Sequence, residues 1–346
     1  MSLSRPANFP LLKLPWLCIR CVFQNWDLFD IIYFATISNR TRRIVKNSKY
    51  PLKEIEVHPR WERKIYMGKT IGAATDRKIW CFKNSYCGYG DKFVLQKNSQ
   101  PLRTGSSYNP DKGYYLESYT ADELDALKMG IDFLIDIFGC KIRKLYVHGD
   151  KLPELFRLGI SSVKELSLSS LFNIADLKYL LETIEVTDKY LFYAQIPKEF
   201  SCDPRIFKCR QLFFGWENSA DWVTLKLLCQ LDVPQLFFMH HRFSIKDIVS
   251  YVTYWFNSEN RKLESLLVDF QNPISQENFK IDHLSPMPFD EKRRKRCAFV
   301  GGWGNADLTR GMDILRKDGL LATVHVDFKS VFFYVWHNRF PDTVQK

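Results

Sequence analysis

The sequence lacks a long apolar run, a signal peptide and a regular set of cysteines. A membrane-spanning helix needs about 18 consecutive apolar residues, and every apolar run here is shorter. The cysteines number 9 among 346 residues and follow no fixed spacing, which excludes a disulfide framework and indicates reduced thiols. We therefore expect a soluble protein of the cytoplasm or the nucleus, without contact with a membrane.

Patterns typical of an active site are also missing. Gly68-Lys69-Thr70 has the ending of a phosphate-binding loop, but Arg63 stands where that loop requires a glycine. The glycine-rich stretch 301–304 does not follow the dinucleotide-binding pattern. Cys18 and Cys21 have the spacing of half a zinc ribbon without a second half, and the 7 histidines do not fall at metal spacing. We expect no catalytic residue, no metal and no cofactor, and therefore a protein that is not an enzyme.

The chain is basic, with 50 lysines and arginines against 39 acidic residues and a net charge of +11. Five of these basic residues are consecutive at 292–296, after two prolines. The run has three interpretations: a nuclear localisation signal, a patch that contacts phosphates, or a solvated loop. A nucleic-acid-binding protein is thus an alternative function. We do not favour it, because the other basic residues are spread along the chain among acidic ones.

The stretch 9–47 predicts three short helices. After Pro15, apolar residues recur every three or four positions, which is one face of a helix. Asp27 is suited to cap the second helix, and Ser38 or Asn39 the third. The stretch has more apolar residues than one inner face holds, and an exposed apolar patch usually marks a surface for a partner.

The middle of the chain predicts short strands and one long helix. Strand-like segments lie at 53–57, 64–67, 78–82 and 92–95. The polar stretch 96–113 predicts a loop. Thr120 and Glu123 have the spacing of a capping box before a helical apolar pattern that ends at Gly139.

From residue 142 onward, strand-like and helical segments alternate. The key leucines of the strand-like segments are separated by 21, 25, 21, 24 and 30 residues; they are Leu145, Leu166, Leu191, Leu212, Leu236 and Leu266. This period is typical of a leucine-rich-repeat-like solenoid. An open α/β layer is the alternative, and in both cases neighbouring strands are expected to lie parallel. Ser244 and Asp247 predict a second capping box, and 322–328 with 331–336 a hairpin.

Aromatic side chains are abundant near these segments. Trp and Tyr are favoured anchors in binding surfaces, but about half of the side chains of each strand should face the core. We therefore expect most members of this set to be buried and the rest to be available for recognition: Trp216, Trp222, Trp255, Phe237 and Phe238.

The N-terminal segment resembles the F-box of a large nematode family of F-box proteins with an F-box associated domain; it reads PLLKLPWL…VFQNWDLFDIIYFATISNRTRRIVK. Three later segments are similar to that associated domain: Phe213-Phe-Gly-Trp216, the stretch 255–264, and the tail 313–336. The similarity touches most of the chain outside residues 50–120, as a pattern with few fixed residues. It implies an F-box at 5–48, a β-rich connector at 50–119 and an F-box associated domain at 120–346.

The predicted fold class is α+β or α/β, with a three-helix F-box followed by a leucine-rich-repeat-like strand–helix domain. The resemblance implies a substrate-recognition subunit of a Skp–cullin–F-box ubiquitin ligase. Its partners would be a Skp-type adaptor, a cullin–RING ligase through that adaptor, and a protein substrate. Besides nucleic-acid binding, the alternative is a scaffold outside any ligase, with an F-box that no longer binds an adaptor. The residues that match the F-box pattern of a leading Leu-Pro and a first amphipathic helix are the predicted adaptor contacts: Leu12, Leu14, Pro15, Ile19 and Val22.

Overall fold

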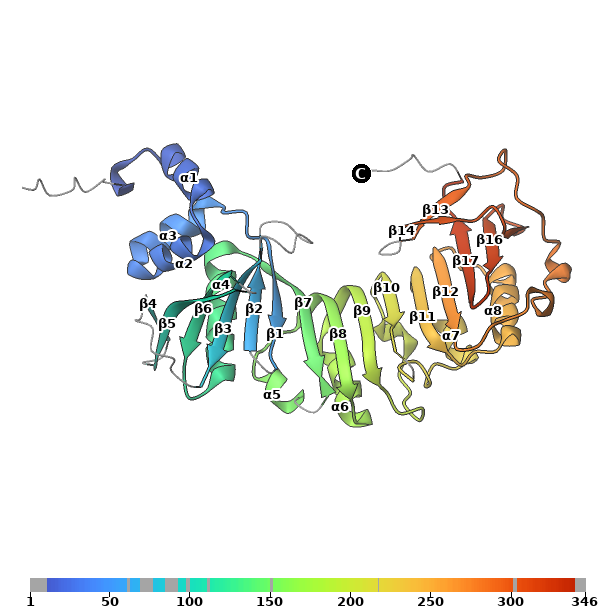
Figure 1. Cartoon of the computed structure of the whole chain (residues 1–346), viewed down its shortest axis with the longest axis horizontal. Helices are drawn as coiled ribbons and strands as arrows, with labels where there is room; N and C mark the ends of the chain where they lie inside the picture. The colour runs from blue at the N-terminus through green and yellow to red at the C-terminus, as the bar shows by residue number, and fades with distance from the viewer. Residues whose placement is uncertain are drawn as a thin grey trace, which may run out of the picture. The chain divides into compact units, whose positions relative to one another are not determined.

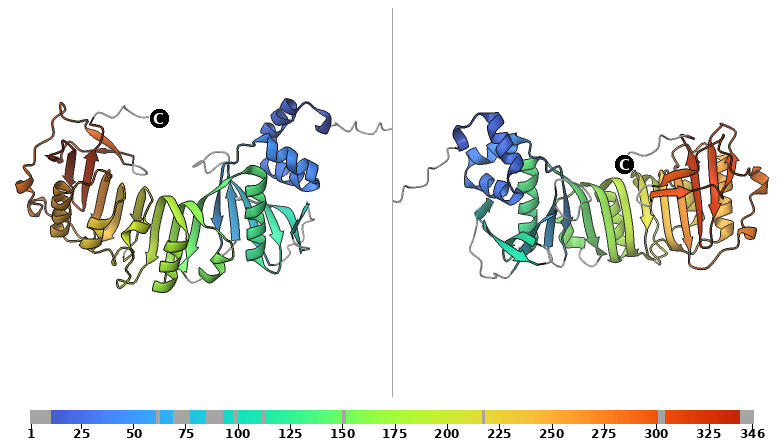
Figure 2. Two further views of the ribbon diagram at one scale, coloured as in Figure 1. Left: turned by 180° about the vertical axis from the view of Figure 1, so that it is seen from behind. Right: turned by 45° about the horizontal axis from the view of Figure 1, so that its top comes forward.

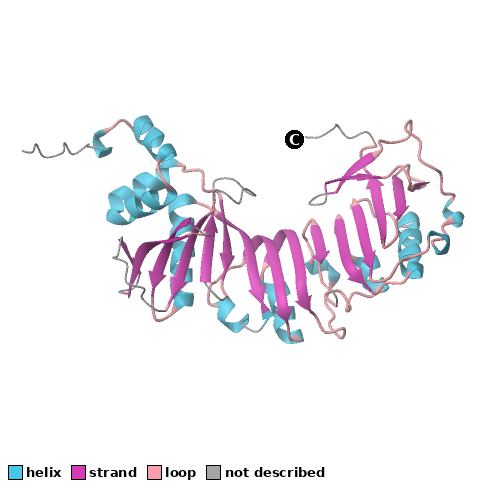
Figure 3. Cartoon of the chain, in the orientation of Figure 1, coloured by secondary structure: helices cyan, strands magenta, loops and turns pink. Residues whose placement is uncertain are grey.

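The computed structural model describes nine stretches of the chain: 11–60, 63–68, 77–84, 93–97, 100–110, 113–149, 152–216, 218–300 and 304–339. The chain divides into two compact units. Unit 1 comprises Met1–Leu145 and Pro153–Gly159, and unit 2 comprises Tyr146–Leu152 and Ile160–Lys346. Fifteen of the described strands belong to one mixed sheet, and helices carry the smaller share of the chain (Figures 1 and 3).

Unit 1 begins with a one-turn 3-10 helix, Leu11–Lys13, and the helices α1 (Trp16–Asn25), α2 (Leu28–Ile37) and α3 (Asn39–Ser48). The caps predicted from the sequence form. Asp27 accepts a hydrogen bond from the backbone N–H of Phe29 at 2.9 Å. Ser38 and Thr41 make a capping box at the start of α3. Short polar side chains thus satisfy the free N–H groups at both helix starts.

The strand order of unit 1 is β7-β1-β2-β3-β6-β5-β4. The pairs β1–β7 and β3–β6 are parallel, and the other neighbours are antiparallel. The strands are β1 (Glu54–His58), β2 (Arg63–Met67), β3 (Lys78–Lys83), β4 (Phe93–Lys97), β5 (Gln100–Asn109), β6 (Gly113–Tyr119) and β7 (Lys141–His148), of which β7 ends in unit 2.

Helix α4 (Glu123–Phe138) packs closely on these strands. Its buried residues include Leu127 and Leu134, both fully buried. A Cβ atom at Gly130 would lie 2.5 Å from Cζ of Phe82 and 3.3 Å from Cδ1 of Ile65. The absence of a side chain at Gly130 therefore permits the close approach of the helix to β2 and β3.

The strand order of unit 2 is β15-β16-β17-β12-β11-β10-β9-β8. Strands β8 to β12 are parallel, and β17, β16 and β15 continue the sheet antiparallel. The strands are β8 (Ser162–Leu171), β9 (Glu185–Gln195), β10 (Gln211–Phe214), β11 (Gln235–His241), β12 (Ser265–Phe270), β15 (Met312–Leu315), β16 (Leu321–Val326) and β17 (Ser330–Trp336).

Both faces of the unit 2 strands are covered in part. The helices α6 (Ile174–Thr183), α7 (Leu225–Gln230) and α8 (Ile245–Asn257) lie on one face, as the views from two sides show (Figure 2). The other face carries a separate two-stranded hairpin of β13 (Cys297–Val300) and β14 (Gly304–Asp307). A short helix α5 (Leu152–Phe156) and the 3-10 helices Pro204–Ile206, Gln276–Asn278 and Asp282–Leu284 complete the described elements.

The helix side of unit 2 is held by a row of stacked rings. Phe192, Phe214 and Phe238 occupy matching positions of β9, β10 and β11. Their ring centroids are 4.7 and 4.8 Å apart, with interplanar angles of 10°. Since equivalent residues of in-register parallel strands are neighbours on one face, the parallel register by itself stacks these rings.

The predicted fold class is wrong. Instead of an F-box followed by leucine-rich-repeat-like units, most of the chain forms one mixed sheet of fifteen described strands. The regular leucines do mark parallel neighbours between β8 and β12, as predicted. The repeat interpretation fails because β17, β16 and β15 add to β12 in the antiparallel sense, and because antiparallel pairs also make up most of the sheet of unit 1.

Other local predictions divide between confirmed and wrong. Three predictions are confirmed: the hairpin β16–β17, the capping box of Ser244 and Asp247, and the end of α4 at Gly139, whose backbone is in the left-handed conformation. The predicted loop 96–113 is wrong in its centre, where β5 pairs with both β4 and β6. Asp122, not Thr120, caps α4. In β5, pairing with both neighbouring strands outweighs the weak strand propensity of its polar residues.

The described cysteines are free, and Cys18 and Cys21 are both exposed on α1. Within the described stretches no helix has the length and apolar character needed to cross a membrane.

Protonation of His241 is expected to destabilise unit 2. This buried imidazole donates from Nε2 to the carbonyl of Ala220 at 2.9 Å, and Nδ1 accepts from the N–H of Phe243 at 2.8 Å. Only the neutral ring makes both bonds, and burial lowers its pKa. The unfolded chain therefore binds more protons below the ordinary histidine pKa of about 6.5. The stabilisation is present above that pH and is lost as the pH falls through the lower folded pKa.

The measurement is the free energy of unfolding by urea across the range from about pH 7 to pH 5. We expect a loss of stability toward acid that is smaller in His241→Gln than in the parent. His283→Gln, at an exposed position, is the control and should keep the parent's slope. Equal slopes for the parent and His241→Gln would contradict the prediction.

Candidate binding surfaces

The first helices of unit 1 present apolar side chains to solvent. Ile19 and Phe23 lie four residues apart on the buried side of α1, with exposed fractions of 5% and 1%. Four large apolar residues of α1 and α2 are exposed: Trp16, Leu17, Tyr33 and Ile37. Exposed apolar residues grouped within so short a stretch are typical of a protein-binding surface.

The predicted adaptor contacts occupy different environments. Pro15 is exposed and precedes the first residue of α1, while Leu12, Leu14 and Val22 are half-buried. Ile19 belongs to the core of the helices. Leu17, at 69% exposure, was not among the predicted contacts. The helical period could have identified it, because it lies on the side of α1 opposite the Ile19–Phe23 stripe.

Ion pairs fix these helices to the rest of unit 1. Asp136 of α4 lies 3.0 Å from Arg42 and 2.8 Å from Lys46, both in α3. The hydrogen bond from Lys46, with a further bond from Arg42, holds the pKa of the Asp136 carboxyl below its ordinary value. Asp27 pairs with Lys78 of β3 at 2.6 Å. These contacts join α3 to α4 and the start of α2 to β3.

An open cleft of about 850 Å³ lies in unit 1, lined by residues of α2, α3, β4 and α4. Its walls combine apolar Val94 and Phe133 with the charged Arg42 and Asp136. Because Arg42 and Asp136 already pair with each other, the cleft offers no free charge at this point for a ligand.

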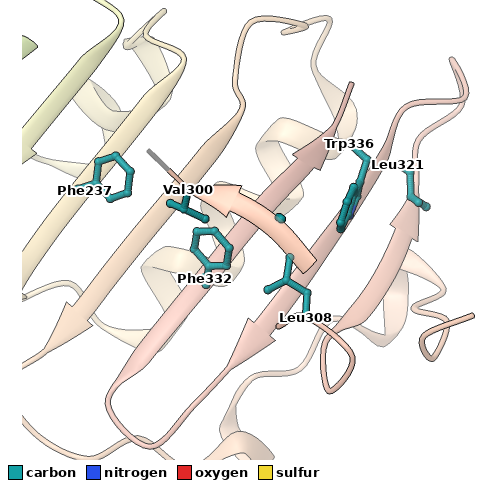
Figure 4. Packing of buried hydrophobic residues seen from close by; sticks show 7 residues of the cluster. Phe237, Val300, Leu308, Leu321, Phe332 and Trp336 are labelled. Carbon is teal, nitrogen blue, oxygen red and sulfur yellow. The ribbon is translucent and has the colours of Figure 1, made fainter. Parts of the chain in front are cut away.

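Unit 2 has an apolar row on the sheet face opposite its helices. Register places five residues side by side in successive strands: Leu191, Phe213, Phe237, Leu267 and Phe332. The hairpin β13–β14 covers one half of this row. Its Ala298 and Val300 are buried against Phe237, Phe332 and Trp336. Figure 4 shows Val300 between Phe237 and Phe332.

The other half of the row is not covered to the same extent. Leu191 and Phe213 are half-buried, Tyr193 is 37% exposed, and Trp216 is 65% exposed. The ring centroids of Tyr193 and Phe213 are 5.7 Å apart. We call Leu191, Tyr193, Phe213 and Trp216 the aromatic surface.

Gly215 determines the form of the aromatic surface. A Cβ atom there would lie 2.4 Å from the ring of Tyr193 and 2.6 Å from that of Phe213. Both rings are therefore able to lie against the backbone of β10 only because residue 215 has no side chain. The glycine makes this part of the sheet face flat and accessible.

The aromatic residues selected from the sequence separate as expected, with most of them in the core. Trp222, Trp255, Phe237 and Phe238 are 0–3% exposed, whereas Trp216 is largely exposed. The sequence pattern gave no means to decide which one would be accessible, because Trp216 follows β10 and lies outside the strand alternation.

The basic run 292–296 is not a free cationic patch. Arg294 is fully buried and forms an ion pair with the buried Asp313 at 2.7 Å. Its guanidinium also donates to the carbonyls of Lys295 and Leu308, and lies over the rings of Phe289 and Trp336. Arg293 pairs with the same carboxylate at 3.1 Å. Two of the five basic residues thus serve the packing of unit 2.

Among the described residues, no group of three or more His, Cys, Asp or Glu side chains is arranged to hold a metal ion.

Comparison with known proteins connects unit 2 to one family. The sequence model described as F-box associated matches residues 205–268, which include β10, β11, α8 and most of β12. An uncharacterized protein of Caenorhabditis elegans, F59B2.9, is 28% identical over 133 residues, or 36% of this chain. The chain spans about a third of that relative, since the aligned part is 31% of the relative's length. No solved structure matches the chain.

The family match supports the resemblance of residues 205–268 to the F-box associated family. The family match lies within unit 2 and contains Phe213, Gly215 and Trp216. It does not extend to the N-terminal helices.

Proposed function

We propose that this protein is a substrate-recognition subunit of a Skp–cullin–F-box ubiquitin ligase and has no catalytic activity of its own. The observation that carries the proposal is the match of residues 205–268 to the F-box associated family. The three short helices at the N-terminus, with Trp16 and Leu17 exposed, support docking to a Skp-type adaptor through this end of the chain.

The proposed mechanism is proximity. One part of the chain binds the adaptor, and unit 2 binds a protein substrate. Tethering converts an encounter between the substrate lysines and the charged conjugating enzyme into an intramolecular event, which raises their effective concentration. Such a subunit needs two binding surfaces and no reactive groups of its own.

Binding of nucleic acid is less well supported. Its main motivation from the sequence was the basic run 292–296 together with the net charge. The burial of Arg294 and the pairing of Arg293 with Asp313 remove two cations from that run.

The test is co-purification of the full-length protein with a Skp-type adaptor. We expect a stable complex for the parent and its loss in Leu14→Asp/Pro15→Ala, because a carboxylate at a half-buried docking position is desolvated without a partner. Phe328→Asp changes a residue of unit 2 that is 67% exposed and is the matched control.

Thermal melting of each variant shows whether the chain still folds. A folded Leu14→Asp/Pro15→Ala variant that keeps the complex would reject these residues as the contact. If the parent bound no Skp-type adaptor, the ligase function itself would be wrong.

A further inference from the structure

The two halves of the apolar row in unit 2 differ in what covers them. On β11, β12 and β17 the row lies beneath the hairpin β13–β14, and Phe237 and Phe332 are 0% and 6% exposed. On β9 and β10 the same row leaves Leu191 and Phe213 half-buried. The ring of Tyr193 lies 5.7 Å from that of Phe213, and Trp216, which follows β10, is 65% exposed. The row then ends at Ser167 of β8, which is small and polar.

The covered half shows what kind of element fits this face. Strand β13 is extended, and its side chains alternate: Ala298 and Val300 face the row, while Phe299 points away and is 68% exposed. The structure therefore covers this apolar row with an extended segment whose alternate residues are apolar. The aromatic surface continues the same row without an interruption in register.

The width of the part that the described residues of the hairpin leave uncovered also favours an extended segment over a helix. From β8 to β10 is two strand spacings, or about 10 Å. A helix with its side chains is about 10–12 Å across and packs with its axis about 8–10 Å from a neighbour. It would meet the hairpin on one side, whereas an extended chain occupies about 5 Å.

We propose that the aromatic surface binds an extended, uncharged segment of a partner protein, with apolar or aromatic side chains at alternate positions. The segment lies beside the hairpin β13–β14 and packs its inward side chains on Leu191, Phe213 and Tyr193, while Trp216 covers one end. Tyr and Trp are frequent anchors of such interfaces. This inference rests on the proposed function, in which unit 2 holds the protein substrate, and it assigns the surface and the chemical class of the bound segment.

The test uses the full-length protein and a phage-displayed library of random short peptides as the probe. A selected peptide is then synthesised with a fluorescent label, and its affinity is measured by anisotropy. We expect the selected peptides to alternate apolar or aromatic residues with small polar ones. Tyr193→Ser/Trp216→Ser should weaken their binding by about tenfold or more, since both anchors are removed.

Phe328→Ser is the matched control, because Phe328 is as exposed as Trp216 but lies at the turn between β16 and β17. It should leave peptide affinity unchanged. Enrichment of no peptide, or equal affinity of the parent and Tyr193→Ser/Trp216→Ser, would overturn the inference.

Co-purification with the Skp-type adaptor separates this inference from the proposed function. The Tyr193→Ser/Trp216→Ser variant should still bind the adaptor. Adaptor binding without any peptide binding rejects the aromatic surface and leaves the ligase function in place. Peptide binding at the aromatic surface by a parent that binds no adaptor rejects the ligase function and keeps the surface.

Discussion

Arg294→Ala is expected to lower the free energy of unfolding of unit 2 by about 3–5 kcal/mol. The substitution removes a guanidinium that is fully buried and leaves the carboxylate of Asp313, also fully buried, without its 2.7 Å partner. A loss of this size is a large part of the 5–15 kcal/mol by which domains are typically stable. Urea unfolding, followed by circular dichroism, measures it.

The expected loss arises from desolvation more than from the attraction within the pair. Asp313 also accepts from Thr323 Oγ1 at 2.7 Å, and Thr323 in turn accepts from Trp336 Nε1 at 2.8 Å. The carboxylate thus lies within a hydrogen-bonded network that excludes water. Without Arg294 its charge is balanced only by the half-buried Arg293.

Arg296→Ala is the matched control, because it changes another arginine of the same basic run. Arg296 has 62% of its side chain exposed and lies 3.4 Å from the exposed Asp307. Surface pairs of this kind contribute about 0–1 kcal/mol. The double variant Arg294→Met/Asp313→Leu should recover much of the loss, since it removes both buried charges. Similar losses for Arg294→Ala and Arg296→Ala would contradict this account.

Phe214→Ala is expected to destabilise unit 2 by about 3–5 kcal/mol, as for other large buried side chains. Phe214 is 1% exposed and lies in the centre of the ring stack, between Phe192 and Phe238. Its edge contact with Trp222, at 6.1 Å between centroids, would be lost as well. The cavity would remain open because the parallel register fixes the rings on both sides.

Phe213→Ala is the control, because Phe213 is adjacent to Phe214 in β10 and lies on the opposite face of the sheet. Phe213 has the same chemistry one residue earlier in β10, but it points to the aromatic surface and is half-buried. Its removal should cost clearly less stability, because less apolar area leaves water on folding. A larger loss from Phe213→Ala than from Phe214→Ala would contradict the assignment of the two faces.

The sequence was informative where short-range chemistry decides the structure. Asp27, Ser38 and Ser244 each cap the helix that their position predicted, since a capping side chain bonds N–H groups two or three residues away. The leucines from Leu166 to Leu266 marked strands that pair in parallel, although Leu191 pairs with Phe213 and not with Leu212.

Long-range pairing decided the rest. The polar residues of β5 form a strand because β4 and β6 pair with them, and the solenoid was wrong because β17 adds to β12 from about sixty residues further along the chain. A run of five basic residues does not reveal that Arg294 meets Asp313 in the core.

The sequence by itself determined most helix caps, the parallel strands and the resemblance of residues 205–268 to the F-box associated family, because these depend on neighbours within a few residues or on a pattern of residues along the chain. Only the tertiary structure decided the mixed sheet, the buried Arg294 and the exposure of Trp216 and Tyr193. These features depend on which distant segments exclude water from a side chain, and that is a property of packing rather than of local sequence.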